Sequence, residues 1–224
     1  AERLGKPIIA HLNHPNFHFS FTAEQLAEVV EEQFFEVYNG HPGINHLGDE
    51  THPGDEQLWD MANAIRVGKL KSAPLYGMAT DDSHEYHGGN VSPGRGWIMV
   101  RAERLDADLL MRALERGDFY GSSGVTLVDV SFEEDIIALE IEGQPGVSYK
   151  TQFIGTRKGE DSAVGEEFDI SESLQPVYRL RGDELYVRAR VTSSRDHPNP
   201  SYAGQKEQAW TQPVGWKKLI GEGQ

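Results

Sequence analysis

In residues 77–84 a short apolar run is followed directly by side chains that can bind a metal ion. Asp82 and His84 are two positions apart, so in an extended segment both side chains point to the same side of the chain. A carboxylate oxygen and an imidazole nitrogen that meet at one point suit a divalent metal such as Zn, Mn or Fe. We therefore predict that Asp82 and His84 are metal ligands and catalytic residues of one site. The competing interpretation is a capped turn with a salt-linked surface pair.

The composition excludes several classes of partner. The chain has 224 residues, a formal net charge of −15, 38% hydrophobic and 25% charged residues, and no cysteine. An acidic surface repels nucleic-acid backbones and anionic membranes, so we expect neither as a partner. Without cysteine, a metal would have to bind His, Asp and Glu. No apolar run approaches the roughly 20 residues of a membrane-spanning helix, which predicts a soluble protein of the cytoplasm or the periplasm.

Strand and helix patterns alternate in the first half of the chain. Apolar runs of strand composition cover residues 7–10, 34–38, 75–79 and 97–100. Helical patterns cover residues 23–33, 58–68 and 106–117. Strands that alternate with helices in this way predict parallel pairing in an α/β layer arrangement.

From about Gly124 onward the pattern consists of strands alone. Residues 137–141 and 185–191 alternate apolar and polar side chains with a period of two, and Gly and Pro turns lie between these stretches. Such a pattern predicts a small antiparallel sheet or sandwich. We therefore expect two parts, a metal-binding part at residues 1–123 and a β-rich part at residues 124–224.

Polar side chains follow the ends of three predicted strands. They are His14 after the first strand, Glu36 and Asn39 at the second, and Asp82 and His84 after the third. In α/β sheets and barrels the functional face lies at the carboxyl ends of the strands. We therefore expect these side chains to share one rim.

Other interpretations of these residues remain open. Glu36 is equally compatible with holding a ligand histidine and with a structural ion pair. His14 could be only a turn histidine before proline, because His197-Pro198-Asn199 repeats the tripeptide in a loop with no adjoining site. Short histidine motifs are weak signals. We interpret His11 and His18 as residues that form local hydrogen bonds rather than as ligands. The remaining histidines are interpreted as loop residues, with His87 the main exception: His41, His46, His52 and His87.

Three segments resemble the later motifs of one protein family. They are residues 9–16, 36–40 and 82–84, with a weaker likeness at Trp59-Asp60 and at residues 94–97. Together they resemble the PHP family, named for polymerase and histidinol phosphatase, whose members are metal-dependent phosphoesterases on a distorted (β/α)7 barrel. The resemblance implies that His14, Asp82 and His84 are metal ligands.

The resemblance also implies a fold. The family's barrel opens with a His-x-His strand, which does not precede Ala1, and a (β/α) barrel takes about 250 residues. The expected fold is therefore α/β, the C-terminal part of a distorted (β/α)7 PHP-type barrel followed by a small antiparallel β subdomain. The N-terminal part of the barrel, or a second chain, is then an expected partner that would complete the metal cluster and cover an open strand edge.

The expected reaction is hydrolysis of a small phosphoester. Two or three divalent metal ions would bind the phosphoryl oxygens in a complete site, and a metal-bound hydroxide would attack phosphorus. Arg95 is the candidate for a bidentate clamp on the substrate phosphate, and Asn39 for orienting substrate or water. A carboxylic or carbamic ester hydrolase would use the same metal site. The other class is a non-catalytic binding module, which a fold-level resemblance does not exclude.

Overall fold

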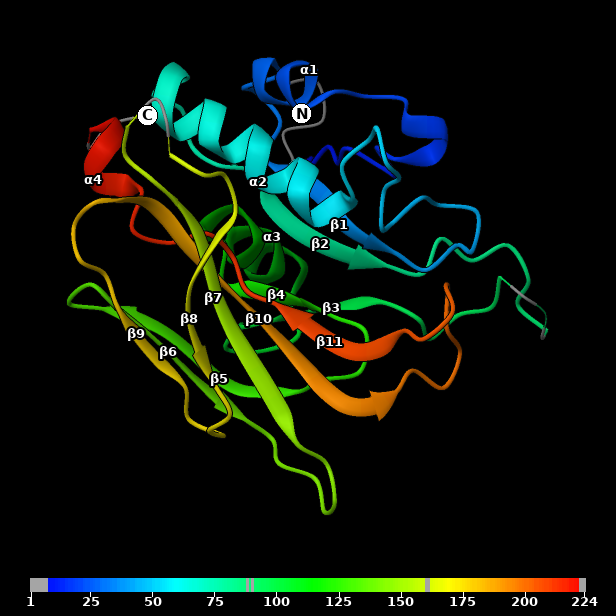
Figure 1. Cartoon of the computed structure of the whole chain (residues 1–224). Coiled ribbons are helices and arrows are strands. Elements are labelled where there is room, and N and C mark those ends of the chain that lie inside the picture. Colours follow the sequence, from blue (N-terminus) through cyan, green and yellow to red (C-terminus); the bar gives the residue numbers. More distant parts are fainter. Residues whose placement is uncertain (1–7, 88, 90, 160–161, 222–224) are drawn as a thin grey trace.

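The computed structural model describes residues 8–87, 89, 91–159 and 162–221. Strands take 33% of the chain and helices 19%, so the protein is mostly β. Two of its three sheets are antiparallel and the third is a parallel pair, and the described residues contain no barrel (Figure 1). The prediction of an α/β fold with a partial (β/α)7 barrel is therefore wrong. Among these residues, no helix combines the length and the apolar character needed to cross a membrane.

The parallel pair consists of β1, Phe34–Asn39, and β2, Tyr76–Thr80. The helices beside it are α1, Ala23–Glu28, and α2, Asp55–Ile65, which continues as a π-helical turn over Arg66–Leu70. Every residue of β1 is buried, so its polar side chains lie inside the protein. Residues 8–10 of the predicted first strand form no strand, and the other edge of β1 pairs with this segment through one bridge further along, from Leu12 to Phe35. Pro7, where that prediction began, lies outside the described residues.

Helix α1 begins where it was predicted and ends early. The hydroxyl of Thr22 accepts a hydrogen bond from the backbone N of Gln25 at 3.4 Å, and Oε1 of Gln25 accepts one from the backbone N of Thr22 at 3.0 Å. This capping box fixes the start of the helix. The helix ends at Glu28, short of the predicted end at residue 33. The Arg66 side chain donates to the carbonyl of Val29 at 2.6 Å, so a distant side chain binds a group that a further helical turn would have used.

A six-stranded antiparallel sheet lies at the centre of the molecule (Figure 1). In spatial order its strands are β3 Trp97–Val100, β4 Phe119–Ser122, β11 Lys206–Trp210, β10 Glu184–Asp196, β7 Tyr149–Arg157 and β8 Glu166–Ser171. β3 and β4 pair antiparallel although a helix, α3 Ala107–Arg116, connects them. A (β/α) barrel needs parallel neighbours, so the barrel pattern does not continue past β2. The predicted division between residues 123 and 124 runs through this sheet.

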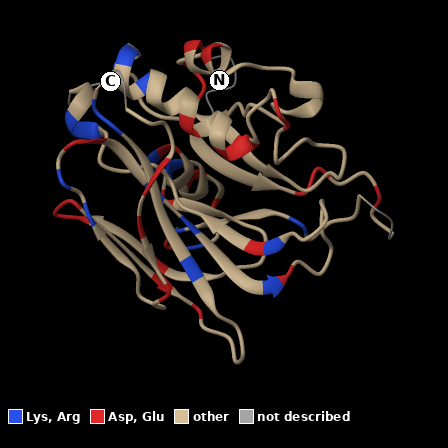
Figure 2. Cartoon of the chain, in the orientation of Figure 1, with Lys and Arg blue, Asp and Glu red and all other residues tan. Residues whose placement is uncertain are grey.

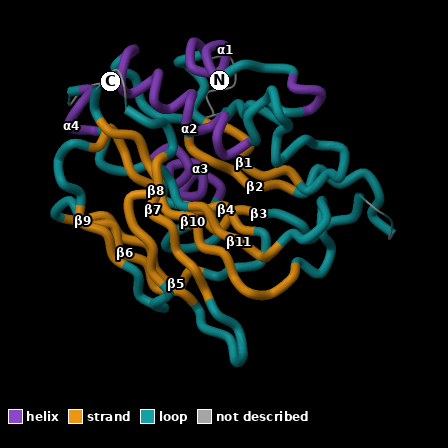
Figure 3. The backbone as a smooth tube through the Cα atoms, in the orientation of Figure 1, coloured by secondary structure: helices purple, strands orange, loops and turns teal. Residues whose placement is uncertain are grey.

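A smaller antiparallel sheet completes the β-rich part. Its strands are β5 Leu127–Glu133, β6 Ile136–Ile141 and β9 Val177–Arg179. The two period-two stretches lie in β6 and β10, and their buried side chains, such as Ile137 and Val187, share one core. Helices α1, α2 and α4, Lys217–Ile220, lie along one side of the molecule (Figure 3). Acidic and basic residues are interspersed along the ribbon rather than gathered by sign (Figure 2).

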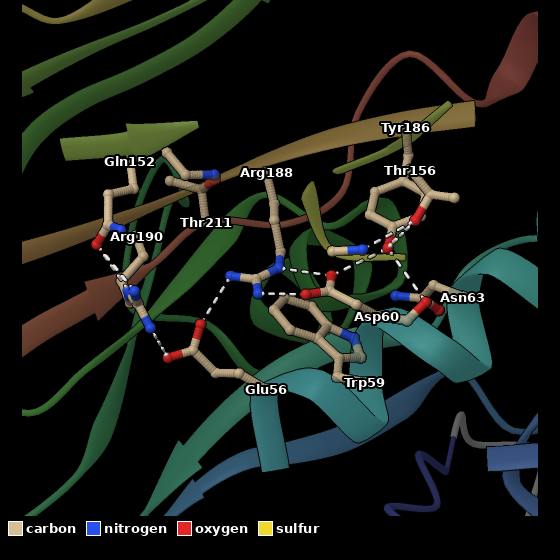
Figure 4. Close-up of polar contacts among 12 residues, drawn as sticks. Glu56, Trp59, Asp60, Asn63, Gln152, Thr156, Tyr186, Arg188, Arg190 and Thr211 are labelled. Atoms are coloured by element: carbon tan, nitrogen blue, oxygen red, sulfur yellow. Dashed lines mark hydrogen bonds and ion pairs between the residues drawn. The ribbon is translucent and has the colours of Figure 1, made fainter. Parts of the chain in front are cut away.

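Buried ion pairs join helix α2 to strand β10 (Figure 4). The side chain of Arg188 is 1% exposed and donates to the Asp60 carboxylate at 2.9 and 2.7 Å. It also pairs with Glu56 at 3.0 Å and lies 4.8 Å from the centroid of the Trp59 ring. The hydroxyl of Tyr186 donates to Asp60 at 2.9 Å. Because the acids belong to α2 and the donors to β10, this network holds the helical side of the molecule on the central sheet.

Candidate functional site

Polar groups from three segments meet around the buried carboxylate of Glu36, and we call them the Glu36 cluster: the backbone N of His14 and the side chains of Glu36, Asn39, Asp82 and His84. Oε2 of Glu36 accepts hydrogen bonds from the backbone N of His14 at 2.5 Å and from Nδ2 of Asn39 at 2.8 Å. Oε1 accepts one from the hydroxyl of Thr80 at 2.5 Å. These bonds bring the segment before α1 together with the ends of β1 and β2.

Asn39 connects Glu36 to Asp82. Nδ2 of Asn39 also donates to Oδ2 of Asp82 at 3.1 Å, and Oδ1 of Asn39 accepts from the backbone N of His41 at 2.7 Å. An amide group has two hydrogens to donate, and both are taken by Glu36 and Asp82. The role of Asn39 in substrate binding stays a prediction. What the geometry adds is that Asn39 positions the carboxylate of Asp82.

Asp82 and His84 present their polar atoms to each other. Nε2 of His84 lies 3.3 Å from Oδ1 of Asp82. With metal–ligand bonds of about 2.0–2.1 Å, two neighbouring ligands of a tetrahedral site are roughly 3.3 Å apart. The side chains are 63% exposed at His84 and 28% at Asp82, so solvent and small molecules reach them. The separation is that of two ligands of one divalent ion, and it is also that of a hydrogen bond between the imidazole and the carboxylate.

The backbone at two predicted ligands is in a conformation that residues other than glycine rarely adopt. The φ angle is 47° at Asp82 and 30° at His14. Backbone of this kind costs about 1–3 kcal/mol and persists where its surroundings hold it. Asn39 binds the Asp82 side chain, and Glu36 binds the backbone N of His14. The strain thus coincides with the hydrogen bonds that place these two residues.

The metal-binding set is incomplete in the part of the chain that is described. Within residues 8–87, 89, 91–159 and 162–221, no group of three or more His, Asp and Glu side chains is arranged to hold a metal ion. The ring of His14 packs edge-on against Phe17, with 5.7 Å between the ring centroids. The residues present therefore fit a divalent metal in donor chemistry and in one pair distance, but not in number.

Two histidines that the sequence pattern left as local or loop residues lie beside the cluster. Burial lowers the pKa of His11, with Glu36 acting in the opposite direction, so the ring is neutral at pH 7. Its Nε2 is buried and has no hydrogen-bond partner among the described residues. The ring of His41 meets that of His84 edge-on, with 5.2 Å between centroids. His11 follows the apolar run at residues 7–10, and His41 lies shortly after the run at residues 34–38. These positions were the feature of the sequence that could have identified both histidines as neighbours of the cluster.

Arg95 is buried and bound to protein oxygens. Nη1 donates to the carbonyl of Gly40 at 2.8 Å, and Nη2 donates to Oδ1 of Asn199 at 2.8 Å. The backbone N of Arg95 donates to Oδ1 of Asp81 at 2.6 Å. The phosphate clamp stays a prediction, although both terminal nitrogens already have protein partners. Nε2 of His197 lies 3.1 Å from the Arg95 carbonyl, so the loop that was expected to adjoin no site packs beside this one.

A buried pair fastens the loop between β1 and α2. Nδ1 of His46 lies 2.8 Å from Oδ2 of Asp55, and the two side chains are 6% and 3% exposed. The ring of His46 also stacks on Tyr38, with 5.3 Å between centroids. His41 belongs to the same loop, so the pair helps to hold His41 beside His84.

Asp55 makes stability depend on pH. Burial raises the pKa of its carboxyl from 3.8 to about 6, although the hydrogen bond from His46 partly opposes the shift. Between these two values the folded state binds more protons than the unfolded state, so stability falls as the pH rises through this window. At about 1.4 kcal/mol per pH unit, the loss amounts to about 3 kcal/mol once the pH is above 6.

Asp55→Asn removes this titration and keeps the shape of the side chain. Relative to the wild type, the variant is expected to gain about 3 kcal/mol between pH 4 and pH 7 in urea unfolding followed by circular dichroism. Asp49→Asn is the matched control, because backbone hydrogen bonding from Thr51, together with His52, lowers the pKa of Asp49 to about 2, below this window. Equal differences from the wild type at both pH values for Asp55→Asn would show that Asp55 does not titrate there.

Comparison of the chain with protein-family models, with curated proteins and with solved structures found no match. What the cluster can do is therefore argued from its own groups. These are a solvent-accessible carboxylate and imidazole pair, an asparagine that positions the carboxylate, and a partly buried histidine whose pKa burial lowers. Oxygen and nitrogen donors of this kind bind divalent cations.

Proposed function

We propose that the Glu36 cluster binds a divalent metal ion and hydrolyses a small phosphoester. The observation that carries the proposal is the distance of 3.3 Å between Oδ1 of Asp82 and Nε2 of His84. Two neighbouring ligands of one tetrahedral metal ion are roughly this far apart. The resemblance of residues 9–16, 36–40 and 82–84 to motifs of PHP phosphoesterases supports the reaction class. Zn, Mn and Fe all accept these donors.

Each group has a distinct part in this proposal. Asn39 binds Oδ2 of Asp82, while Oδ1 and Nε2 of His84, which lie within hydrogen-bonding distance of each other, would both turn to the metal when it binds. His11 is neutral and its buried Nε2 is unused among the described residues, so it is a candidate for a further nitrogen ligand alongside the predicted ligand His14. When bound, the metal would act as a Lewis acid on an ester oxygen and lower the pKa of water.

An ester hydrolase on the same groups is the second candidate. Arg95 is buried, and each of its terminal nitrogens already donates one hydrogen bond within the protein, to Gly40 or to Asn199, which favours a substrate that needs no arginine clamp. A neutral carboxylic or carbamic ester needs no such clamp, and an acidic protein does not repel it. The non-catalytic binding module is favoured by a different observation, the absence of a three-ligand group among the described residues.

Metal titration separates an enzyme from a binding module. The chain, stripped of metal and titrated with Zn²⁺ or Mn²⁺ by calorimetry, is expected to bind metal stoichiometrically. His84→Ala should weaken binding at least tenfold, which is about 1.4 kcal/mol, because one of two spaced ligands is lost. His52→Ala is the matched control, since His52 is half-exposed and pairs with Asp49.

The same proteins are then assayed with p-nitrophenyl phosphate and p-nitrophenyl acetate. Metal-dependent release of nitrophenol from the phosphate, lost in His84→Ala and kept in His52→Ala, is the result expected of the phosphoesterase. Turnover of the acetate alone would identify the ester hydrolase instead. If the chain binds no stoichiometric metal, and His84→Ala changes neither metal affinity nor turnover, the proposal is wrong.

A further inference from the structure

A pocket of about 750 Å³ lies at the far end of β3 from the Glu36 cluster. β3 begins at Trp97, directly after the Arg95-Gly96 turn that Asp81 holds, and ends at Val100, which lines the pocket. The other walls come from β4, β5 and residues 212–218, which lead into α4. Ligand sites typically measure about 300–1,000 Å³. The pocket therefore has the size of a small-molecule site and is separate from the cluster.

Aromatic side chains form much of the wall: Tyr76, Phe119, Tyr120, Phe132 and Trp216. Tyr76 meets Phe119 edge-on, with 6.2 Å between centroids and 87° between the ring planes. Met99 and Phe132 are 42% and 36% exposed, so apolar groups also reach the opening. Aromatic rings stack or meet edge-on at about 4.5–7 Å, which makes such walls suited to a flat aromatic molecule.

Most charged side chains around the pocket are already paired. The pairs are Arg101 with Asp129, Arg116 with Asp118, and Lys218 with Asp135. Lys217 forms no ion pair with the described residues, and its Nζ lies 5.8 Å from the centroid of the Trp216 ring. Glu133, a carboxylate on the same pocket, also lacks an ion pair within the described part of the chain. An anion would be attracted by Lys217 and repelled by Glu133.

The hydroxyl of Tyr76 is available to a ligand. It makes no hydrogen bond to the described residues, whereas the hydroxyl of Tyr120 accepts one from the backbone N of Leu127 at 2.8 Å. Burial raises the pKa of Tyr76 to about 12, and Asp118 acts in the same direction. The hydroxyl therefore keeps its proton at neutral pH and can donate it in a hydrogen bond. Within the described residues, the hydroxyl is not among the fully buried polar atoms that lack a partner, so it is within reach of a ligand in the pocket.

We infer that this pocket binds a small aromatic molecule with one negative charge. Its rings would lie between the aromatic walls, a hydrogen-bond acceptor would face the Tyr76 hydroxyl, and its carboxylate or sulfonate would lie near Lys217. None of these residues belongs to the Glu36 cluster, so the inference does not depend on the proposed hydrolase.

The test uses 1-anilinonaphthalene-8-sulfonate, an aromatic anion whose fluorescence rises on burial, titrated into the whole chain. Wild type is expected to give a saturable one-site curve. Lys217→Gln should weaken binding about fivefold and Tyr76→Phe about threefold, because each removes one polar contact. Glu133→Gln should tighten binding about twofold, because it removes a repulsive charge. Lys158→Gln is the matched control, since Lys158 is exposed, lies outside the pocket lining and donates to the Gly182 carbonyl.

Two further measurements establish that the variants are folded and that the dye binds in the pocket. Thermal unfolding shows that each variant is folded, and hydrogen exchange with the dye at saturation shows where it binds. Slower exchange at residues 127–133 and 212–218 is the expected outcome. A curve without saturation, equal affinity in wild type, Lys217→Gln and Tyr76→Phe, or protection confined to other segments would overturn the inference.

Discussion

Replacing Arg188 with alanine is expected to lower the free energy of unfolding by about 3–5 kcal/mol. The Arg188 guanidinium binds both Asp60 and Glu56 across the junction of α2 and β10 (Figure 4). Burial by itself lowers the pKa of Arg188, but the two carboxylates more than reverse this, so the pKa is raised and the side chain stays charged. Without Arg188, the Asp60 carboxylate, 4% exposed, would be a buried charge without its cation. Urea unfolding followed by circular dichroism measures the loss.

Arg190→Ala is the matched control on the same strand. Arg190 pairs with Glu56 at 2.8 Å but is 28% exposed, and ion pairs near solvent contribute about 0–1 kcal/mol. A double variant, Arg188→Met with Asp60→Leu, removes the buried Arg188–Asp60 pair and leaves Glu56 paired with Arg190, so it should recover most of the loss, because apolar replacements of buried ion pairs are often neutral. If Arg188→Ala costs no more than Arg190→Ala, the buried network is not what holds α2 on the sheet.

Glu36→Ala is expected to cost about 3 kcal/mol of stability and to disassemble the cluster. The backbone N of His14, the amide of Asn39 and the hydroxyl of Thr80 would all lose their acceptor at a site where Glu36 is 3% exposed. Each buried polar group without a partner costs about 1–3 kcal/mol. Under the proposed function, metal affinity should also fall at least tenfold, because Asn39 would no longer hold Asp82 in place. Urea unfolding and calorimetric metal titration measure the two effects separately.

Thr80→Val provides the comparison for Glu36→Ala. It removes one of the three hydrogen bonds and should cost about 1 kcal/mol, with Asn39 and Asp82 left in position. A stability loss in Glu36→Ala no larger than in Thr80→Val would contradict the three-bond network. A full stability loss with unchanged metal affinity would contradict only the connection between this network and the metal.

Features that depend on neighbouring residues could be predicted from the sequence. The Thr22 capping box starts α1, Asp106 caps α3 through the backbone N of Leu109 at 3.2 Å, and Gly117 ends α3 with φ at 77°. Asp82 and His84 lie together as their spacing of two suggested, but the backbone at Asp82 has a φ of 47°, so an extended segment is not what brings them together. In each case the interacting groups lie within a few positions of one another, so the local pattern determines the outcome.

Features that depend on distant residues could not be predicted. Arg66 binds the Val29 carbonyl just after α1, Arg95 binds Asn199 from the loop after β10, and Glu36 accepts a hydrogen bond from Thr80 on the next strand. No short motif encodes such partners, because the chain must first be folded for them to meet.

The division between sequence and tertiary structure is clearest at the fold itself. The sequence alone determined that residues 34–38, 75–79 and 97–100 are apolar enough to become strands and that polar residues follow the first two, since both follow from side-chain chemistry along the chain, whereas residues 8–10 form no strand. The tertiary structure decided that β3 and β4 pair antiparallel and join the long strands β10 and β7 in one sheet. Apolar faces that bury each other come from distant segments, as Ile137 of β6 and Val187 of β10 do in a core shared by two sheets. As a result of this strand pairing, the protein has a central antiparallel sheet instead of the expected barrel. The Glu36 cluster lies at the end of one pair of parallel strands, β1 and β2.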